Sequence, residues 1–250
     1  MILRVIYTKQ DVPSTPEDTL CMQHTPYCQA IGSLMYIAIA TCPDITFTIA
    51  ILSCFLNNPG DAHWDAVKHI FRYLQGTKTY QLTYGGKRHD LKGFYDADGG
   101  TQEDWHTIFR YTFLLDGGVI SWSSKKQELI TLSTAEAEYV AAMHTTKEVL
   151  WLHKLLRQIL PDLVHLPTTI YCDNQAAIKL ITTDNYHSCT KHLNQCYQFV
   201  WEVASKGVIK PLYCPSEDMV ADVLTKALPK WKVAAHANTL GMHCTCGGVV

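Results

Sequence analysis

Apolar residues recur at helical spacing most regularly between Thr134 and about Ile159. Ser133 directly precedes this run, and Glu136 comes three residues after Ser133. This is the spacing of a capping box at the start of a helix. Glu138 lies on the helical face that also carries Ala142, Thr145, Val149, Leu152 and Leu156. A carboxylate on a packed face is unfavourable unless it is paired or binds a metal ion. Glu138 is therefore the first candidate functional residue.

The hydrophobic pattern divides the chain into a helical part and an α/β part. Helices are predicted at Tyr27–Ala40, at Pro43–Leu56 and at Ala62–Leu74, the last with Asp61 as its N-cap. Beyond about Leu82 the order becomes β-β-β-α-β-α-α-β-α, which predicts an α/β fold with a mixed five-stranded sheet and flanking helices. The predicted organisation is an irregular segment 1–26, a helical unit 27–85, an α/β domain 86–228 and a tail 229–250.

The elements of the α/β part are bounded by turn and capping residues. The predicted strands are Leu91–Ala97, Phe109–Leu115, Val119–Ser123, Thr168–Cys172 and Val208–Tyr213. The predicted helices are Thr134–Ile159, Asn174–Ile181, Lys191–Ser205 and Glu217–Leu228. Asp116-Gly117-Gly118 separates two of the strands and predicts a hairpin.

Three further acids lie where strands end or helices pack. Asp96 ends the first strand, with Asp98 on the same face, Asp173 follows the fourth strand, and Asp222 lies beside the apolar stripe of the last helix. Each has a structural alternative: Asp98 as a turn residue, Asp173 as a helix N-cap, and Asp222 as a solvated acid. Carboxylates gathered at one sheet edge repel each other unless cations such as Mg²⁺ or Mn²⁺ bind. Two such ions form a clamp for in-line attack on a phosphodiester.

Net charge, cysteine distribution and the apolar stretches limit the classes of protein to which the chain can belong. The 250 residues carry a net charge of −2, which neither indicates nor excludes a local nucleic-acid-binding patch. The ten cysteines are scattered and no secretory signal is present, so we expect reduced intracellular thiols. The apolar stretch from Ala30 to Leu56 is interrupted at Pro43, so we expect no membrane span.

Ten short motifs occur in one order between about residues 26 and 241. They are Ala30-Ile-Gly-Ser-Leu-Met-Tyr, Pro43-Asp-Ile, His63-Trp-Asp-Ala-Val-Lys, Arg72-Tyr-Leu-Gln-Gly-Thr, Tyr95-Asp-Ala-Asp, Ile120-Ser-Trp-Ser-Ser-Lys-Lys-Gln, Thr134-Ala-Glu-Ala-Glu-Tyr-Val-Ala, Tyr171-Cys-Asp-Asn-Gln-Ala-Ala, Thr190-Lys-His and Ala221-Asp-Val-Leu-Thr-Lys. With these motifs the chain resembles the C-terminal part of a Ty1/copia-type retrotransposon Pol polyprotein, which comprises the reverse transcriptase connection and the ribonuclease H domain.

The resemblance implies an RNase H-like fold and cleavage of the RNA strand of RNA–DNA hybrids. It implies that the metal ligands are Asp96, Glu138, Asp173 and Asp222, holding two Mg²⁺ or Mn²⁺ ions with Asp96 bridging both. Lys191 and His192 are the expected phosphate contacts, with a solvated helix start as their alternative. The implied partners are the hybrid and a separate reverse transcriptase chain, since no Tyr-x-Asp-Asp polymerase motif occurs in the sequence.

Some residues depart from the family pattern. Asp98-Gly99-Gly100 replaces the usual Asp-Trp-Ala-Gly, and Arg110 replaces the glycine of Ser-Gly-Tyr, where we expect backbone strain. Several charges usual after Thr190-Lys-His are missing. Two hypotheses therefore stand beside an active ribonuclease H. One is a silent, folded remnant that at most binds nucleic acid weakly, and the other is a structural fragment that docks on a polymerase chain through apolar faces of the N-terminal helices, at Leu34, Met35, Ile37, Ile45, Phe47 and Ile49.

Overall fold

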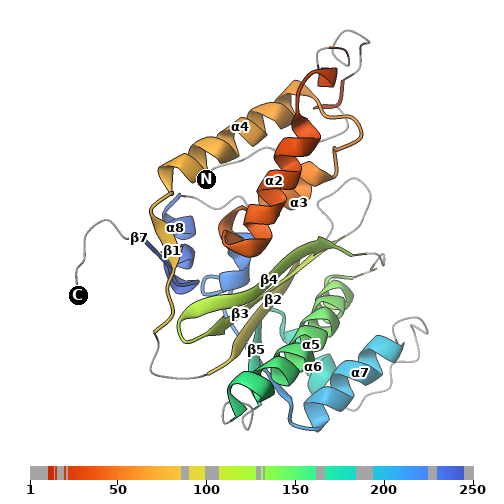
Figure 1. Cartoon of the computed structure of the whole chain (residues 1–250). Coiled ribbons are helices and arrows are strands. Elements are labelled where there is room, and N and C mark those ends of the chain that lie inside the picture. The colour runs from red at the N-terminus through yellow and green to blue at the C-terminus, as the bar shows by residue number, and fades with distance from the viewer. Residues whose placement is uncertain are drawn as a thin grey trace. The chain divides into compact units, whose positions relative to one another are not determined.

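The computed structural model describes residues 11–13, 15, 20, 22–85, 90–98, 107–127, 131, 133–161, 167–183, 194–224 and 230–244. The chain divides into two compact units. The sheet unit is Tyr84–Asp222, and the helical unit combines Met1–Thr83 with Val223–Val250 (Figure 1).

The sheet unit contains one mixed five-stranded sheet. Its strands are β2 (Lys92–Asp98), β3 (Ile108–Leu115), β4 (Gly118–Lys126), β5 (Thr168–Cys172) and β6 (Ile209–Tyr213). They lie in the order β4-β3-β2-β5-β6, with β4, β3 and β2 antiparallel and β5 and β6 added in parallel to β2. The predicted α/β class and mixed five-stranded sheet are confirmed.

Helices α5 (Thr134–Ile159), α6 (Gln175–Thr182) and α7 (Asn194–Ser205) contact one another, and α5 packs on β2 and β3 (Figure 1). Ser133 begins α5 as predicted, because its Oγ accepts a hydrogen bond from the Glu136 backbone N–H at 3.2 Å. The predicted face is buried at every position, namely Glu138, Ala142, Thr145, Val149, Leu152 and Leu156. This face forms the core with β-strand residues such as Tyr95 and Ile170.

The hairpin between β3 and β4 is also confirmed, although its turn is shorter than predicted. Asp116 and Gly117 form the turn, with φ values of 51° and 82°. Positive φ at both central residues suits the right-handed twist of the flanking strands. Gly118 is already the first residue of β4.

The predicted last helix, Glu217–Leu228, is wrong over its described residues. A turn at 216–218 leads into a short 3₁₀ helix, η4 (Val220–Leu224), and residues 225–229 lie outside the described parts. Met219 and Ala221 are both buried with Cys214 against Phe94 and Tyr171. Positions two apart diverge widely around an α-helix, so burying both on one surface favours a tighter, irregular path.

The helical unit contains α2 (Tyr27–Ala40), the 3₁₀ helix η2 (Pro43–Ile45), α3 (Thr46–Ser53) and α4 (Asp61–Gly76). The predicted second helix is thus a 3₁₀ turn followed by a shorter α-helix. Asp61 is not an N-cap: Gly60 holds that position, and its backbone N–H donates to His63 Nδ1 at 2.9 Å. Helix α8 (Lys230–Thr239) and the antiparallel pair of β1 (Tyr80–Leu82) with β7 (Met242–Cys244) were not predicted.

The apolar residues proposed to dock on a polymerase are largely used inside the helical unit. Leu34, Ile45 and Ile49 are at most 2% exposed and pack with Val67 and Ile70 of α4. The docking hypothesis is therefore wrong for these side chains. No helix in the described parts of the chain is both long and apolar enough to cross a membrane.

The packing of α5 on the sheet predicts unequal costs for two leucines of this helix. Leu152 is 2% exposed in the core and Leu155 is 36% exposed. Leu152→Ala should lower the free energy of unfolding by about 2–5 kcal/mol, because it leaves a cavity. Leu155→Ala should lower it by about 1 kcal/mol or less. Urea denaturation measures both, and equal costs would contradict the described packing.

Candidate active site

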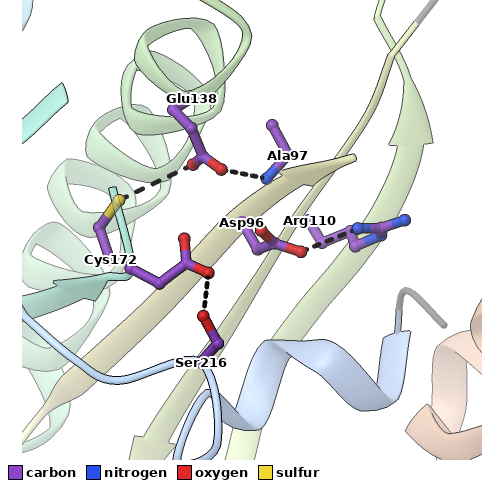
Figure 2. Close-up of polar contacts among 7 residues, drawn as sticks. Asp96, Ala97, Arg110, Glu138, Cys172 and Ser216 are labelled. Atoms are coloured by element: carbon purple, nitrogen blue, oxygen red, sulfur yellow. Dashed lines mark hydrogen bonds and ion pairs between the residues drawn. The ribbon is translucent and has the colours of Figure 1, made fainter. Parts of the chain in front are cut away.

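Glu138 ties the first turns of α5 to the end of β2. Its side chain is buried, and its Oε1 accepts a hydrogen bond from the Ala97 backbone N–H at 3.1 Å (Figure 2). Ala97 directly follows Asp96 in β2. The carboxylate that the helical pattern singled out therefore lies beside the strand that carries the next predicted acid.

The end of β5 supplies Asp173 together with a thiol that sequence reasoning did not select. The Cys172 thiol donates to Glu138 Oε2, with the sulfur 3.8 Å from that oxygen, and Ser216 Oγ donates to Asp173 Oδ2 at 2.8 Å. Figure 2 shows Cys172 and Glu138 directed toward one another from β5 and α5. The position of Cys172 directly before Asp173 was an available signal, whereas nothing in the sequence indicated Ser216.

Asp173 does not cap the following helix. Asn174 is the N-cap of α6, and its Oδ1 accepts from the backbone N–H groups of Ala176 at 3.0 Å and Ala177 at 3.2 Å. The structural alternative for Asp173 is therefore wrong. Its carboxylate is available for a role other than starting α6.

Burial and neighbouring charges raise the pKa of Glu138 well above the ordinary value of a glutamate. Burial is the main cause, followed by the negative charge of Asp96, and Asp173 adds to the rise, while the hydrogen bond from Ala97 opposes it. Burial and the charge of Glu138 likewise raise the pKa of the Cys172 thiol. A raised pKa keeps this thiol protonated, which suits its role as a hydrogen-bond donor.

Among the described residues, ligand atoms of Glu138, Cys172 and Asp173 all lie within 4.8 Å of one another. Mg²⁺ and Mn²⁺ prefer carboxylate oxygens, and a protonated thiol is a poor ligand for them. Glu138 and Asp173 thus fit one divalent ion, and such an ion would relieve the repulsion that raises the pKa of Glu138.

Asp96 acts on Glu138 through its charge and a side-chain hydrogen bond, and it also has a partner in β3. Arg110 Nη1 donates to Asp96 Oδ2 at 2.9 Å, and the two side chains are 0% and 5% exposed. The two residues are direct cross-strand partners between β2 and β3, so they lie on the same face of the sheet. Figure 2 shows the Asp96 carboxylate directed toward Arg110.

The expected backbone strain at Arg110 is not observed. Arg110 is paired with Asp96 on one side and with Ser124 on the other, in regular β3. Within the described parts of the chain, Asp116 is the non-glycine residue with a positive φ. Arg110 therefore matters through its charge, which the sequence interpretation missed.

Asp222 lies in η4 and is 7% exposed, so the alternative of a solvated acid is wrong. Asp222 and Asp173 both act on the Cys214 thiol. Burial is the main cause of the raised pKa of this thiol, followed by the negative charges of Asp218, Asp173 and Asp222. Lys191 and His192 lie outside the described residues.

Sequence comparison identifies relatives that match almost the whole chain. The retrovirus-related Pol polyprotein from transposon TNT 1-94 of Nicotiana tabacum is 40% identical over 237 residues, 94% of this chain. The corresponding polyprotein from transposon RE2 of Arabidopsis thaliana is 34% identical over 231 residues, 90% of this chain. The chain belongs to the Pol polyproteins of copia-type transposons.

This copia-type Pol chain spans 18% and 16% of the lengths of those two relatives. No protein-family model matches it. Among solved structures, LC11-RNase H1 in complex with RNA/DNA hybrid aligns with 54% of this chain and 93% of that chain, with a TM-score of 0.39 and 14% identity.

The electrostatics of Glu138 predict a pH-dependent gain in stability for Glu138→Gln in metal-free protein. A carboxyl group with a raised folded pKa stabilises the fold fully below its unfolded pKa of about 4.3, and this contribution is lost as pH rises through the folded value. Glu138→Gln should therefore raise the melting temperature at pH 7, and the gain should vanish near pH 4.

Glu136→Gln is the matched control, since it removes the same charge two residues earlier in α5. A negative charge near a helix N-terminus is favourable, so this variant should not gain stability at pH 7. Thermal unfolding in EDTA measures both variants. A Glu138→Gln protein that is less stable than wild type at pH 7 would contradict the described electrostatics.

Proposed function

We propose that this chain carries the ribonuclease H activity of a copia-type Pol polyprotein and hydrolyses the RNA strand of RNA–DNA hybrids with Mg²⁺ or Mn²⁺. One observation carries the proposal: Glu138 and Asp173, from two separate elements, present carboxylate oxygens within 4.8 Å of each other. The negative charge of Asp96 also raises the pKa of Glu138. Acids brought together in this way, with Glu138 buried and Asp173 half-buried, suit a divalent cation and the phosphodiester that it binds.

The residues of the chain orient these carboxylates. The Ala97 N–H and the Cys172 thiol each hold one oxygen of Glu138, and Ser216 holds one oxygen of Asp173. A bound divalent cation supplies charge stabilisation for a phosphodiester under attack by water. In this proposal Asp96 and Asp222 are the remaining acids of the site.

Selection of the hybrid would depend on groove shape and on contacts to 2′-hydroxyl groups. Lys191 and His192 are the proposed phosphate contacts. With a net charge of −2, binding has to come from local contacts and not from the charge of the whole chain. Polymerisation is not part of the proposal, and a separate reverse transcriptase chain is the proposed source of that activity.

A second candidate function is a silent, folded remnant that at most binds nucleic acid. The ion pair of Arg110 with Asp96 favours it, because this carboxylate is the one that the family resemblance assigns to both metal ions. The two candidates differ in whether metal-loaded, folded protein cleaves a hybrid at all.

Cleavage of a labelled RNA–DNA hybrid tests the proposal. Wild type should cleave slowly and only with Mg²⁺ or Mn²⁺. Asp173→Asn should reduce the rate by more than about 100-fold, because changes to groups that merely support a metal ligand already cost about 10–100-fold.

Asp218→Asn is the matched control, since Asp218 is an exposed acid in the turn after Ser216. This variant should cleave at the wild-type rate. Equal rates for Asp173→Asn and wild type would refute the site assignment. Absence of cleavage by folded, metal-loaded wild type would refute the enzymatic proposal and favour the remnant.

A further inference from the structure

The guanidinium of Arg110 provides Asp96 with a positive charge from within the chain. The two side chains are buried and joined at 2.9 Å, and they face each other in the antiparallel register of β2 and β3. The contact is therefore built into the strand pairing. It is not a surface ion pair of the kind that solvent and salt weaken.

We propose that Arg110 takes the place of a metal ion at Asp96, so that wild type holds one divalent ion, between Glu138 and Asp173, and not two. The proposal rests on the proposed function, because a second ion is expected only of a ribonuclease H-type site. Arg110 is then a residue that suppresses the site while satisfying the buried carboxylate of Asp96.

The competition between Arg110 and a metal ion is unequal. The β3 strand places the guanidinium beside Asp96 within the same chain, whereas Mg²⁺ has to leave part of its hydration shell and is dilute in solution. An arginine side chain stays charged in proteins, so Arg110 does not release Asp96 by losing its proton.

Electrostatic repulsion acts in the same direction. A divalent cation at Asp96 would lie next to a buried guanidinium, where the low polarisability of the interior strengthens repulsion between like charges. The cluster of Glu138 and Asp173 is not paired with Arg110 in this way and keeps its capacity for one ion.

Arg110 cannot supply the chemistry of the ion that it replaces. A guanidinium carries one positive charge and only donates hydrogen bonds, so it offers no coordination position for water or a phosphate oxygen. It therefore stabilises Asp96 in the folded chain and withholds it from the reaction. This explains how the acids and the fold coexist with a suppressed site.

The number of Mn²⁺ ions bound per chain, measured by electron paramagnetic resonance, tests the proposal. Arg110→Gly restores the residue usual in the family, Arg110→Gln removes the charge while filling the space, and Arg110→Lys keeps a positive charge as the control. Wild type and Arg110→Lys should bind one ion. Arg110→Gly and Arg110→Gln should bind a second, with an affinity roughly 10- to 100-fold above that of wild type at this position.

The second ion should disappear again when Asp96→Asn is added to Arg110→Gly. The proposal is overturned if wild type binds two ions, or if the folded charge-removing variants bind no more than wild type. If neither variant folds, the ion count of wild type decides, since one ion supports the proposal and two ions overturn it.

Hybrid cleavage by the same metal-loaded proteins separates this inference from the proposed function. A second ion in Arg110→Gly without any cleavage refutes the ribonuclease function and leaves the role of Arg110 intact. Cleavage by Arg110→Gly at the wild-type rate refutes suppression by Arg110 and leaves the ribonuclease function intact. A rate increase of about 10-fold or more, in parallel with the second ion, supports both.

Discussion

Buried carboxylates need a cation or a hydrogen-bond donor, and this need governs the arrangement of the candidate site. Buried Asp96 is paired with Arg110, and half-buried Asp173 accepts a hydrogen bond from Ser216. Glu138 receives two donors, one from the backbone of β2 and one from Cys172. These contacts orient the carboxylates, but burial and the charges of Asp96 and Asp173 still raise the pKa of Glu138.

The fold brings the acids together through elements whose ends are fixed independently. Ser133 begins α5 five residues before Glu138, and Asn174 begins α6 directly after Asp173. The register of β2 and β3 sets Arg110 opposite Asp96. Local capping therefore positions two acids near each other, while strand pairing gives a third acid to an arginine. The ion pair at Asp96 therefore lies within regular strand pairing of the fold.

The sequence predicted those features of the fold that depend on neighbouring residues in the chain. The bounds of α5 and β5, and the burial of Glu138, follow from helical periodicity, capping and strand propensity. The pairing of β1 with β7 and the irregular path through η4 depend on contacts between distant residues, so no local pattern indicated them. Arg110 was noticed as a replaced glycine, but its partner is known only from the register of two strands. Its role was therefore misread as strain.

Membership in the copia-type Pol family explains why these acids are present, and Arg110 explains how this chain differs from the pattern. Anomalous diffraction from crystals of wild type soaked in Mn²⁺ tests the central claim most directly. One manganese peak between Glu138 and Asp173, with Arg110 still bonded to Asp96, is the result that we predict. A second peak coordinated by Asp96, with Arg110 displaced, would contradict it.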